Sequence, residues 1–168
     1  MLIASMNPCP CGYYGSKDKN CSCTEKQISR YINKISGPML DRIDIHIEVD
    51  AVDYQKLQNT GKEESSEQIR QRVNKARKIA QERYKSYGIY SNSELTPRLI
   101  DKYCALGKDE KEILRNAFDK MGFSARAYGR ILKVARTIAD LDEKENIEIK
   151  HIAEAIKYRD LDRKYWMN

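Results

Sequence analysis

Four cysteines near the amino terminus carry the clearest chemistry in the sequence. Cys9-x-Cys11 is followed, after nine intervening residues, by Cys21-x-Cys23. Two close cysteine pairs separated by a turn-rich loop can place four thiolates at the tetrahedral corners that zinc prefers, without a hydrophobic core. The pattern predicts a structural zinc site that holds the loop, because four cysteine ligands leave no open position for water or substrate.

Two other states of these cysteines stay open. The one-residue gap within each pair departs from the commoner two-residue gap, so reduced free thiols are the main alternative to zinc. A disulfide framework is the least favoured state, because the cysteine count is odd and four of the five lie in the first 23 residues. Cys104, the fifth, falls at an apolar helical position and is interpreted as a small core residue.

Arginines stand at two further places where anion chemistry is conceivable. Arg42 lies where a turn-rich segment enters a predicted strand, and Asp41 and Asp44 beside it can hold its guanidinium in one direction. Arg126 lies in the first turn of a predicted helix, and Arg130 follows one turn later, so both can face one phosphate group. Arginine side chains at the positive end of a helix are slightly unfavourable, so their presence indicates that an anion binds there. The simpler alternatives are a surface ion pair for Arg42 and a solvated helix face for the other two.

Two short strands are predicted in the first third of the chain. Residues 2–6 form an apolar run that ends at Asn7-Pro8, and residues 43–49 alternate apolar and polar side chains with period two. Asn7 would then stand at the carboxyl end of a buried strand, where an amide can orient a water or a phosphate. A plain turn cap before proline is the alternative interpretation of Asn7.

The remainder of the chain has helical periodicity. Ser65-x-x-Gln68 is typical of a capping box, and Ile69 and Val73 begin the apolar face of the helix that follows. Glycine, proline and serine mark the other helix ends. The predicted helices cover 28–35, 65 to about 85, 97–106, 108–121, 124–139 and 149 to about 159.

Composition limits the class of protein. With 168 residues, 40% of them hydrophobic and 33% charged, the chain can bury a core as one domain or two small ones. No apolar run approaches the roughly 20 residues needed to cross a bilayer, so we expect a cytoplasmic protein without a membrane partner. The net charge of +6 permits contact with nucleic acid, although acidic residues are interspersed along the chain.

Taken together, these segments resemble a known family. Four segments follow one another along the chain: ASMNPCPCGYYG, CSC, RYINKISGPMLDRIDIHIEV and FSARAYGRILKVARTIADL. Together they are similar to the magnesium-chelatase-like AAA+ ATPases of the ComM/YifB type, and the similarity extends over nearly the whole chain. The resemblance implies an α+β fragment of an α/β AAA+ module, in which a Cys-rich loop and short strands precede a helical lid bundle. It implies three parts: 1–60, the second half of the core with its Cys-rich insert; 61–91, a connecting helix; and 92–168, the lid.

The same resemblance implies a role for each polar site. Asn7 would be the sensor 1 residue, Arg42 the arginine finger supplied to a neighbouring subunit, and Arg126 the sensor 2 residue that meets the ATP phosphates, whereas Arg130 receives no role. The four cysteines correspond to the cysteine-rich insert of this subfamily. A complete protein of this type would bind ATP and Mg²⁺, form a ring that we expect to be hexameric, and drive DNA branch migration in recombination.

The sequence departs from the family by lacking G-x-x-x-x-G-K-[ST] and an apolar strand that ends in paired acids for magnesium. We therefore expect a fragment that does not hydrolyse ATP alone. The alternative function is a zinc-stapled basic module that binds nucleic acid or protein, with Lys17, Lys19 and Lys26 as its cations. A chelatase role is discounted, because no porphyrin pocket or magnesium-insertion site is recognisable.

Overall fold

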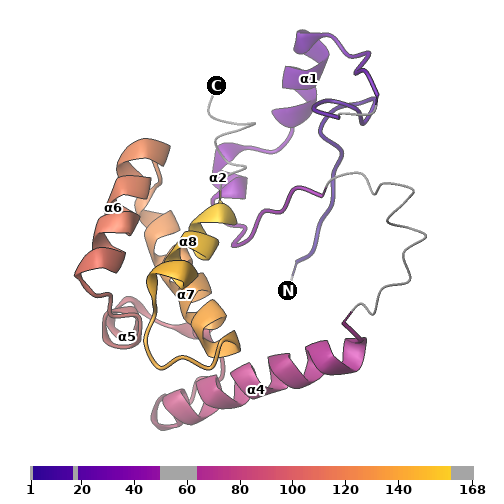
Figure 1. Cartoon of the computed structure of the whole chain (residues 1–168). Coiled ribbons are helices and arrows are strands. Elements are labelled where there is room, and N and C mark those ends of the chain that lie inside the picture. The colour runs from indigo at the N-terminus through magenta and orange to yellow at the C-terminus, as the bar shows by residue number, and fades with distance from the viewer. Residues whose placement is uncertain (1, 17–18, 50–63, 160–168) are drawn as a thin grey trace. The chain divides into compact units, whose positions relative to one another are not determined.

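The computed structural model describes residues 2–16, 19–49 and 64–159, and every regular element in these ranges is helical (Figure 1). The described chain forms two compact units. The Cys-rich unit contains the described residues up to Ile43 together with 47–49, and the helical unit contains 44–46 together with 64–159. Their elements are α1 (Glu25–Ile32) and α2 (Gly37–Leu40), then α4 (Ser66–Tyr84), η1 (Lys85–Tyr87), η2 (Asn92–Glu94), α5 (Pro97–Tyr103), α6 (Lys108–Met121), α7 (Ala125–Leu141) and α8 (Ile149–Lys157).

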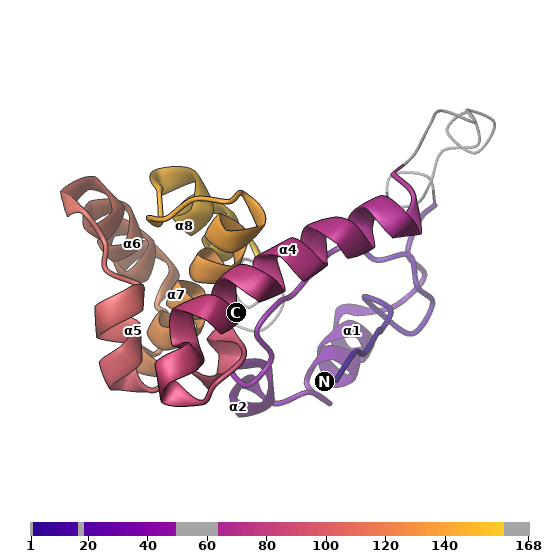
Figure 2. The same cartoon turned by 90° about the horizontal axis from the view of Figure 1, so that it is seen from below.

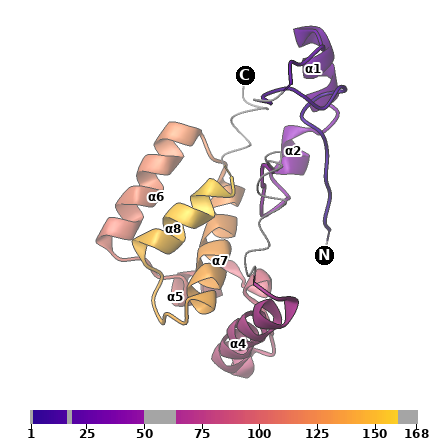
Figure 3. The ribbon, with the colours of Figure 1, turned by 45° about the vertical axis from the view of Figure 1, so that its right-hand side comes forward.

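Helix α7 is the centre of the helical unit. It packs against α4, α5 and α8, and α6 packs against α8, beside which it runs in Figure 3. The predicted apolar stripe of α7 is confirmed, because Ile131, Leu132 and Ala135 are at most 3% exposed. Together with Leu114 of α6 and Ile152 of α8 they form the core of this unit. Burial of this one stripe therefore fixes the helix that carries Arg126 and Arg130.

Local capping signals set the helix ends as predicted. The Ser65 side chain accepts from the backbone N–H of Gln68 at 3.3 Å, and the Gln68 side chain accepts from the backbone N–H of Ser65 at 2.8 Å, which completes the capping box. Gly122 adopts φ 62° and donates its N–H to the Phe118 carbonyl, closing α6. Ser124 caps α7. These short-range bonds are encoded within a few residues, which is why the sequence predicted them.

The apolar face predicted for α4 is only partly buried. Ala76, Ala80 and Tyr84 are covered, whereas Ile69 and Val73 remain 42% and 40% exposed. Both Figure 1 and Figure 2 show the first half of α4 extending beyond α7 and α8. Periodicity identified the face of the helix correctly, but the length over which that face is covered depends on the neighbouring helices.

Two features of the Cys-rich unit differ from the predictions. Helix α1 begins three residues before the predicted start, because Thr24 and Gln27 form a capping box that the prediction missed. A short helix, α2, forms at Gly37–Leu40, where the sequence predicted only a helix stop. Proline is accepted in a first helical turn, since its missing N–H has no partner there in any case.

The two predicted strands are not formed in the described chain. Leu2 and Ile3 are 69% and 83% exposed, and Ile47 and Val49 are 65% and 84% exposed. Period-two alternation indicates a strand only if a neighbouring strand accepts the backbone hydrogen bonds, and none of the described residues provides one. Residues 44–46 lie instead on the helical unit, as described below.

The predicted boundary between residues 60 and 61 lies outside the described residues, as does most of the polar segment 59–64. Among the described helices, none combines the length and the apolar character needed to span a bilayer.

Candidate functional site

The four cysteines converge on one point in the Cys-rich unit. The Cys9 sulfur lies 3.3 Å from that of Cys11 and 3.7 Å from that of Cys21, and the Cys11 and Cys21 sulfurs are 3.5 Å apart. All four sulfurs, including that of Cys23, lie within 4.8 Å of one another. Sulfurs bound to one zinc ion at about 2.3 Å stand about 3.8 Å apart at tetrahedral corners. The cluster can therefore hold a metal ion, as its spacing in the sequence predicted.

Local backbone geometry builds this cluster. The Gly12 N–H donates to the Cys9 carbonyl at 3.0 Å, and the turn requires φ +84° at Gly12. A left-handed conformation costs glycine little, so the chain can reverse between Cys9 and Cys11 without strain. The Asn7 side chain lies against this turn: a Cβ on Gly12 would stand 3.8 Å from Asn7 Nδ2. Asn7 is exposed and belongs to the surroundings of the cysteine cluster.

The pKa values of the thiols shift in opposite directions within the cluster. A backbone hydrogen bond at Tyr13 lowers the pKa of Cys11 to about 5. At Cys21 a backbone hydrogen bond at Cys23 lowers the pKa, but desolvation and hydrogen bonds with the other thiols outweigh it and raise the pKa to about 12. Four neighbouring thiolates repel one another, so they ionise together only around a positive ion. An all-sulfur donor set of this kind fits zinc, with no position left open for catalysis.

The fifth cysteine is confirmed as a core residue. Cys104 is 3% exposed at the carboxyl end of α5, and burial raises the pKa of its thiol to about 11. It is thus a neutral packing group in the helical unit.

Arg42 lies on the surface just after α2. Its Nη1 donates to the Pro38 carbonyl at 2.7 Å, and its backbone N–H donates to the Met39 carbonyl at 3.0 Å. Asp44, which the sequence suggested as a holder of the Arg42 guanidinium, forms an ion pair with Arg130. The prediction for Asp44 was wrong because sequence proximity cannot reveal a partner 86 residues further along the chain.

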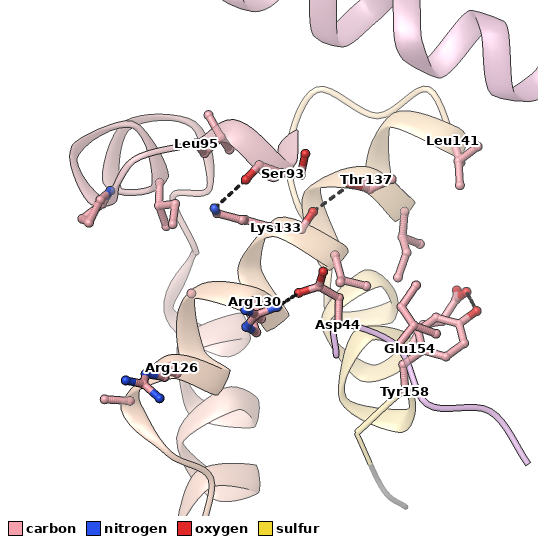
Figure 4. Close-up of a pocket in the computed structure, with 17 residues that line it drawn as sticks. Asp44, Ser93, Leu95, Arg126, Arg130, Lys133, Thr137, Leu141, Glu154 and Tyr158 are labelled. Atoms are coloured by element: carbon pink, nitrogen blue, oxygen red, sulfur yellow. Dashed lines mark hydrogen bonds and ion pairs between the residues drawn. The ribbon is translucent and has the colours of Figure 1, made fainter. Parts of the chain in front are cut away.

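An open groove in the helical unit contains the other predicted arginines (Figure 4). Arg126 and Arg130 project from successive turns of α7, and Lys133 follows on the same helix. Arg130 pairs with Asp44, and Lys133 Nζ donates to the Ser93 carbonyl at 2.8 Å. Arg126 is exposed, and no hydrogen bond or ion pair joins it to another described residue. As far as the structure describes the chain, Arg126 therefore offers an available guanidinium beside the amino terminus of a 17-residue helix, a suitable position for an anion.

A second cluster with metal-ligand residue types is a capping arrangement. Asp142, Glu148 and His151 bring their ligand atoms within 4.8 Å of one another. His151 Nδ1, however, accepts from the Glu148 backbone N–H at 2.9 Å, and Nε2 lies 3.2 Å from Asp142 Oδ2. Lys150 also pairs with Asp142. Since both imidazole nitrogens are engaged, these residues fix the start of α8 rather than a metal ion.

The sequence analysis missed a buried polar network that includes two residues of α7. Asp140 and Arg136 are 1% and 2% exposed, and Arg136 Nε donates to Asp140 Oδ1 at 3.2 Å. Arg83 of α4 and Asn92 of η2 also donate to the Asp140 carboxylate. The only signal for this network in the sequence is the opposite charge at positions i and i+4 of α7, which is common on solvated helices as well.

Comparison with known proteins extends over both units. Residues 63–159 match the family model for the C-terminal region of magnesium chelatase subunit ChlI, and residues 1–57 match the model for magnesium chelatase subunit ChlI. The chain is 45% identical over 159 residues to the competence protein ComM of Haemophilus influenzae, covering 94% of this chain and 30% of that protein. It is 40% and 38% identical to YifB of Salmonella typhimurium and of Escherichia coli, in each case covering 96% of this chain and 31% of the relative. The chain thus spans about a third of the length of these relatives.

Proposed function

The chain belongs to the magnesium-chelatase-like family of the ComM and YifB type and corresponds to the C-terminal part of these proteins. We propose that it is the part of a ring-forming AAA+ ATPase that carries the sensor residues, the arginine finger and the lid. Arg126 carries the proposal. Its guanidinium has no bond to another described residue and lies at the amino terminus of α7, where the helix end and the side chain both attract the phosphates of a nucleotide. In this role Arg126 is sensor 2, and α5 to α8 form the helical lid.

The other two assignments belong to the Cys-rich unit. Arg42 is exposed after α2, as a finger offered to the ATP of a neighbouring subunit must be, and Asn7 is the sensor 1 residue that orients the attacking water. Phosphoryl transfer needs its developing negative charge neutralised, and an arginine supplied in trans contributes on the order of 10³-fold or more to turnover. A hexameric ring places one finger at each subunit boundary. We retain the division into 1–60, 61–91 and 92–168 as part of this proposal.

ATP and Mg²⁺ bind to a polypeptide that also carries the phosphate-binding loop and the magnesium-binding acids. This sequence contains neither of them. One relative is named a competence protein, and the resemblance implies that the motor acts on DNA during recombination. The net charge of +6 is compatible with contact to a polyanion. We propose a cytoplasmic protein whose partners are neighbouring copies of itself and DNA.

The experiment that tests the motor role compares variants of the polypeptide that joins this chain to its phosphate-binding segment. Arg42→Ala and Arg126→Ala should each reduce ATP turnover by about 10³-fold, whereas Arg115→Gln serves as the control. Arg115 forms an exposed pair with Asp119 on α6, outside the groove. Circular dichroism should show an unchanged helical content for all three variants. Normal turnover in Arg42→Ala or in Arg126→Ala would contradict the corresponding assignment.

We propose zinc as the ion in the cysteine cluster, with a structural role. Protein purified under reducing conditions without chelator should contain about one zinc per chain, and a strong chelator should lower its melting temperature. Cys9→Ser should lower the metal content most clearly, because the Cys9 side chain is fully buried in the cluster. Cys104→Ser, purified in the same way, should have the metal content of the wild type. Metal-free protein from such a preparation would contradict the zinc assignment.

A binding module without catalysis is the second candidate, and the closed cysteine site favours it because such a site stabilises a loop and performs no chemistry. Lys19 stacks on Tyr13 beside this cluster, 5.0 Å from the ring centroid. Under this candidate, Lys19→Glu with Lys26→Glu weakens binding to DNA and reduces its salt dependence. Unchanged affinity in this double variant would count against the module.

A further inference from the structure

The cations of helix α4 differ in whether an acidic side chain neutralises them. In the first half of the helix, three exposed cations each form an ion pair with a glutamate: Arg70 with Glu67, Arg72 with Glu64 and Lys75 with Glu143. Near its end, Arg83 pairs with the buried Asp140. Arg77 and Lys78 lie between these pairs and are exposed, and no hydrogen bond or ion pair joins either of them to another described residue. Both side chains can therefore meet an anion from outside the chain.

These cations lie on the outer side of α4. Ala76 and Ala80 are at most 8% exposed and mark the side of the helix that is buried. Since each residue turns an α-helix by about 100°, Lys78 points away from both alanines. Lys85 follows Lys78 after two helical turns, continues the same line and is exposed. In Figure 1, α4 runs along the lower edge of the helical unit, with α7 and α8 on one side of it. A line of exposed cations thus follows the outer side of this helix.

Exposed aromatic side chains follow where this line of cations ends. Tyr87 of η1 is 42% exposed, and Tyr90, three residues later, is 66% exposed. Lys102 Nζ of α5 donates to the Tyr87 hydroxyl at 2.9 Å, and Tyr103 contacts the Tyr87 ring edge to face, with centroids 6.0 Å apart. Tyr103 also contacts Tyr84 at the end of α4, with centroids 5.1 Å apart. The Tyr87 ring is therefore fixed to the helical unit and still open to solvent.

The surroundings of Tyr87 are positively charged. Helix α5 contains two cations, Arg98 and Lys102, and one acid, Asp101. The hydrogen bond from Lys102 lowers the pKa of Tyr87 most, and the charge of Arg98 lowers this pKa further. Lys102 Nζ also lies 5.5 Å from the centroid of the Tyr87 ring. Exposed aromatic rings among cations are the two components of surfaces that bind single-stranded nucleic acid, since bases stack on the rings and phosphates are attracted to the cations.

We propose that single-stranded DNA binds to this part of the helical unit, here named the Tyr87 surface, which comprises Arg77, Lys78, Lys85, Tyr87, Tyr90 and Lys102. Tyr87 and Tyr90 stack on bases, and the cations neutralise phosphates. A single strand is favoured over a duplex because paired and stacked bases offer no free face to a tyrosine ring. All six residues belong to the helical unit, so the Tyr87 surface is complete within it. The inference rests on the proposed function for its choice of DNA as the partner, and adds where and in which form DNA binds.

The first test concerns stacking and measures the fluorescence anisotropy of a labelled oligothymidylate in the presence of the 168-residue chain. An oligonucleotide of about 20 nucleotides is long enough for a site of about 4–16 nucleotides. Tyr90→Ala should weaken binding about 5- to 30-fold, the effect of losing one stacked base. Tyr90→Phe should bind like the wild type, because it keeps the ring. Wild-type affinity in Tyr90→Ala would overturn the proposal.

Tyr90 is the suitable position for this test. No hydrogen bond or ring contact joins its side chain to any residue that the structure describes. The melting temperature of Tyr90→Ala, followed by circular dichroism, should therefore equal that of the wild type. A duplex of the same length should bind more weakly and should be insensitive to Tyr90→Ala. Equal affinity for the duplex and the single strand would overturn the preference for a single strand.

The second test concerns the phosphates. Each phosphate contact on a single strand contributes about 0.7 to the slope of log K against log salt concentration, so Arg77→Gln with Lys78→Gln should reduce this slope by about 1.4. Lys108→Gln with Lys111→Gln is the matched control, because it removes the same charge from exposed positions of α6. This control should keep the slope of the wild type. An equal reduction in both double variants would show a general effect of net charge and overturn the Tyr87 surface.

The same variants in the polypeptide with ATPase activity separate this inference from the proposed function. If that polypeptide binds the oligonucleotide and neither Tyr90→Ala nor Arg77→Gln with Lys78→Gln weakens binding, the Tyr87 surface is overturned and a motor that acts on DNA remains. If it binds no DNA at all, the DNA partner of the proposed function fails, and the Tyr87 surface fails with it. Turnover in Arg42→Ala and Arg126→Ala judges the ATPase assignment independently of both results.

Discussion

Replacing Asp140 by asparagine should destabilise the helical unit by about 3 kcal/mol. The Asp140 carboxylate is 1% exposed. It accepts from Arg83 at 2.5 and 3.0 Å, from Arg136 at 3.2 Å and from Asn92 at 2.8 Å. These bonds join α4 and η2 to α7, the helix that carries Arg126. The Asp140→Asn variant keeps the volume of the side chain but removes the charge that two arginines share.

The magnitude follows from what each arginine retains. Removing one partner of a buried ion pair costs about 3–5 kcal/mol, because the other charge is left without compensation. Arg136 still donates to the carbonyls of Lys144 and Glu145, at 2.6 and 2.7 Å. The Arg83 side chain is 16% exposed and can reach water. Both facts place the expected loss at the lower end of the range.

The assay is urea unfolding of the whole chain followed by circular dichroism at 222 nm, which reports mainly on the helical unit. Glu143→Gln is the matched control, because Glu143 forms a 2.6 Å ion pair with Lys75 in which both side chains are more than half exposed. That variant should lose less than about 1 kcal/mol. A loss below 1 kcal/mol for Asp140→Asn as well would refute the reasoning, since the charge of Asp140 would then contribute no more than that of a surface residue.

Three further outcomes are expected. Gly12→Ala should weaken metal binding about 5- to 30-fold in competition with a chromophoric chelator, because φ +84° costs an L-residue roughly 1–2 kcal/mol; an unchanged affinity would mean that the turn is not part of the site. Hydrogen bonds from Lys150 and then His151 lower the pKa of Asp142 in the folded chain below its ordinary value of 3.8. The ionised Asp142 side chain therefore stabilises the fold at pH values above 3.8, and this stabilisation is lost as the pH falls through the pKa of the folded chain. The melting temperature of Asp142→Asn should therefore lie below that of the wild type at pH 7 and approach it at pH 2, and a constant difference would argue against this ionisation. Leu132→Ala, at a core position 3% exposed, should cost about 2–5 kcal/mol of unfolding free energy in urea, and a cost under 1 kcal/mol would indicate that α7 is not central to the core.

The sequence predicted those features that depend on residues close together in the chain. The Ser65 capping box, the glycine end of α6 and the Ser124 cap of α7 each involve bonds across three or four residues. The convergence of Cys9 with Cys21 was predictable as well, because the loop between them is short and rich in turn residues. The apolar stripe of α7 followed from its period.

The sequence by itself thus determined helices α4 to α8, several of their ends and the cysteine cluster, since the interactions that form them are local. Only the tertiary structure decided which charges are buried and which partners they have. Asp140 is buried among arginines, whereas Asp44 crosses to Arg130, and neither choice is marked by the residues next to them. Residues 43–49 have the period of a strand, yet residues 44–46 are held by α7 and α8. The reason is physical: local bonds form wherever the right residues follow one another, but the burial and pairing of a charge depend on which distant segments the folded chain brings beside it.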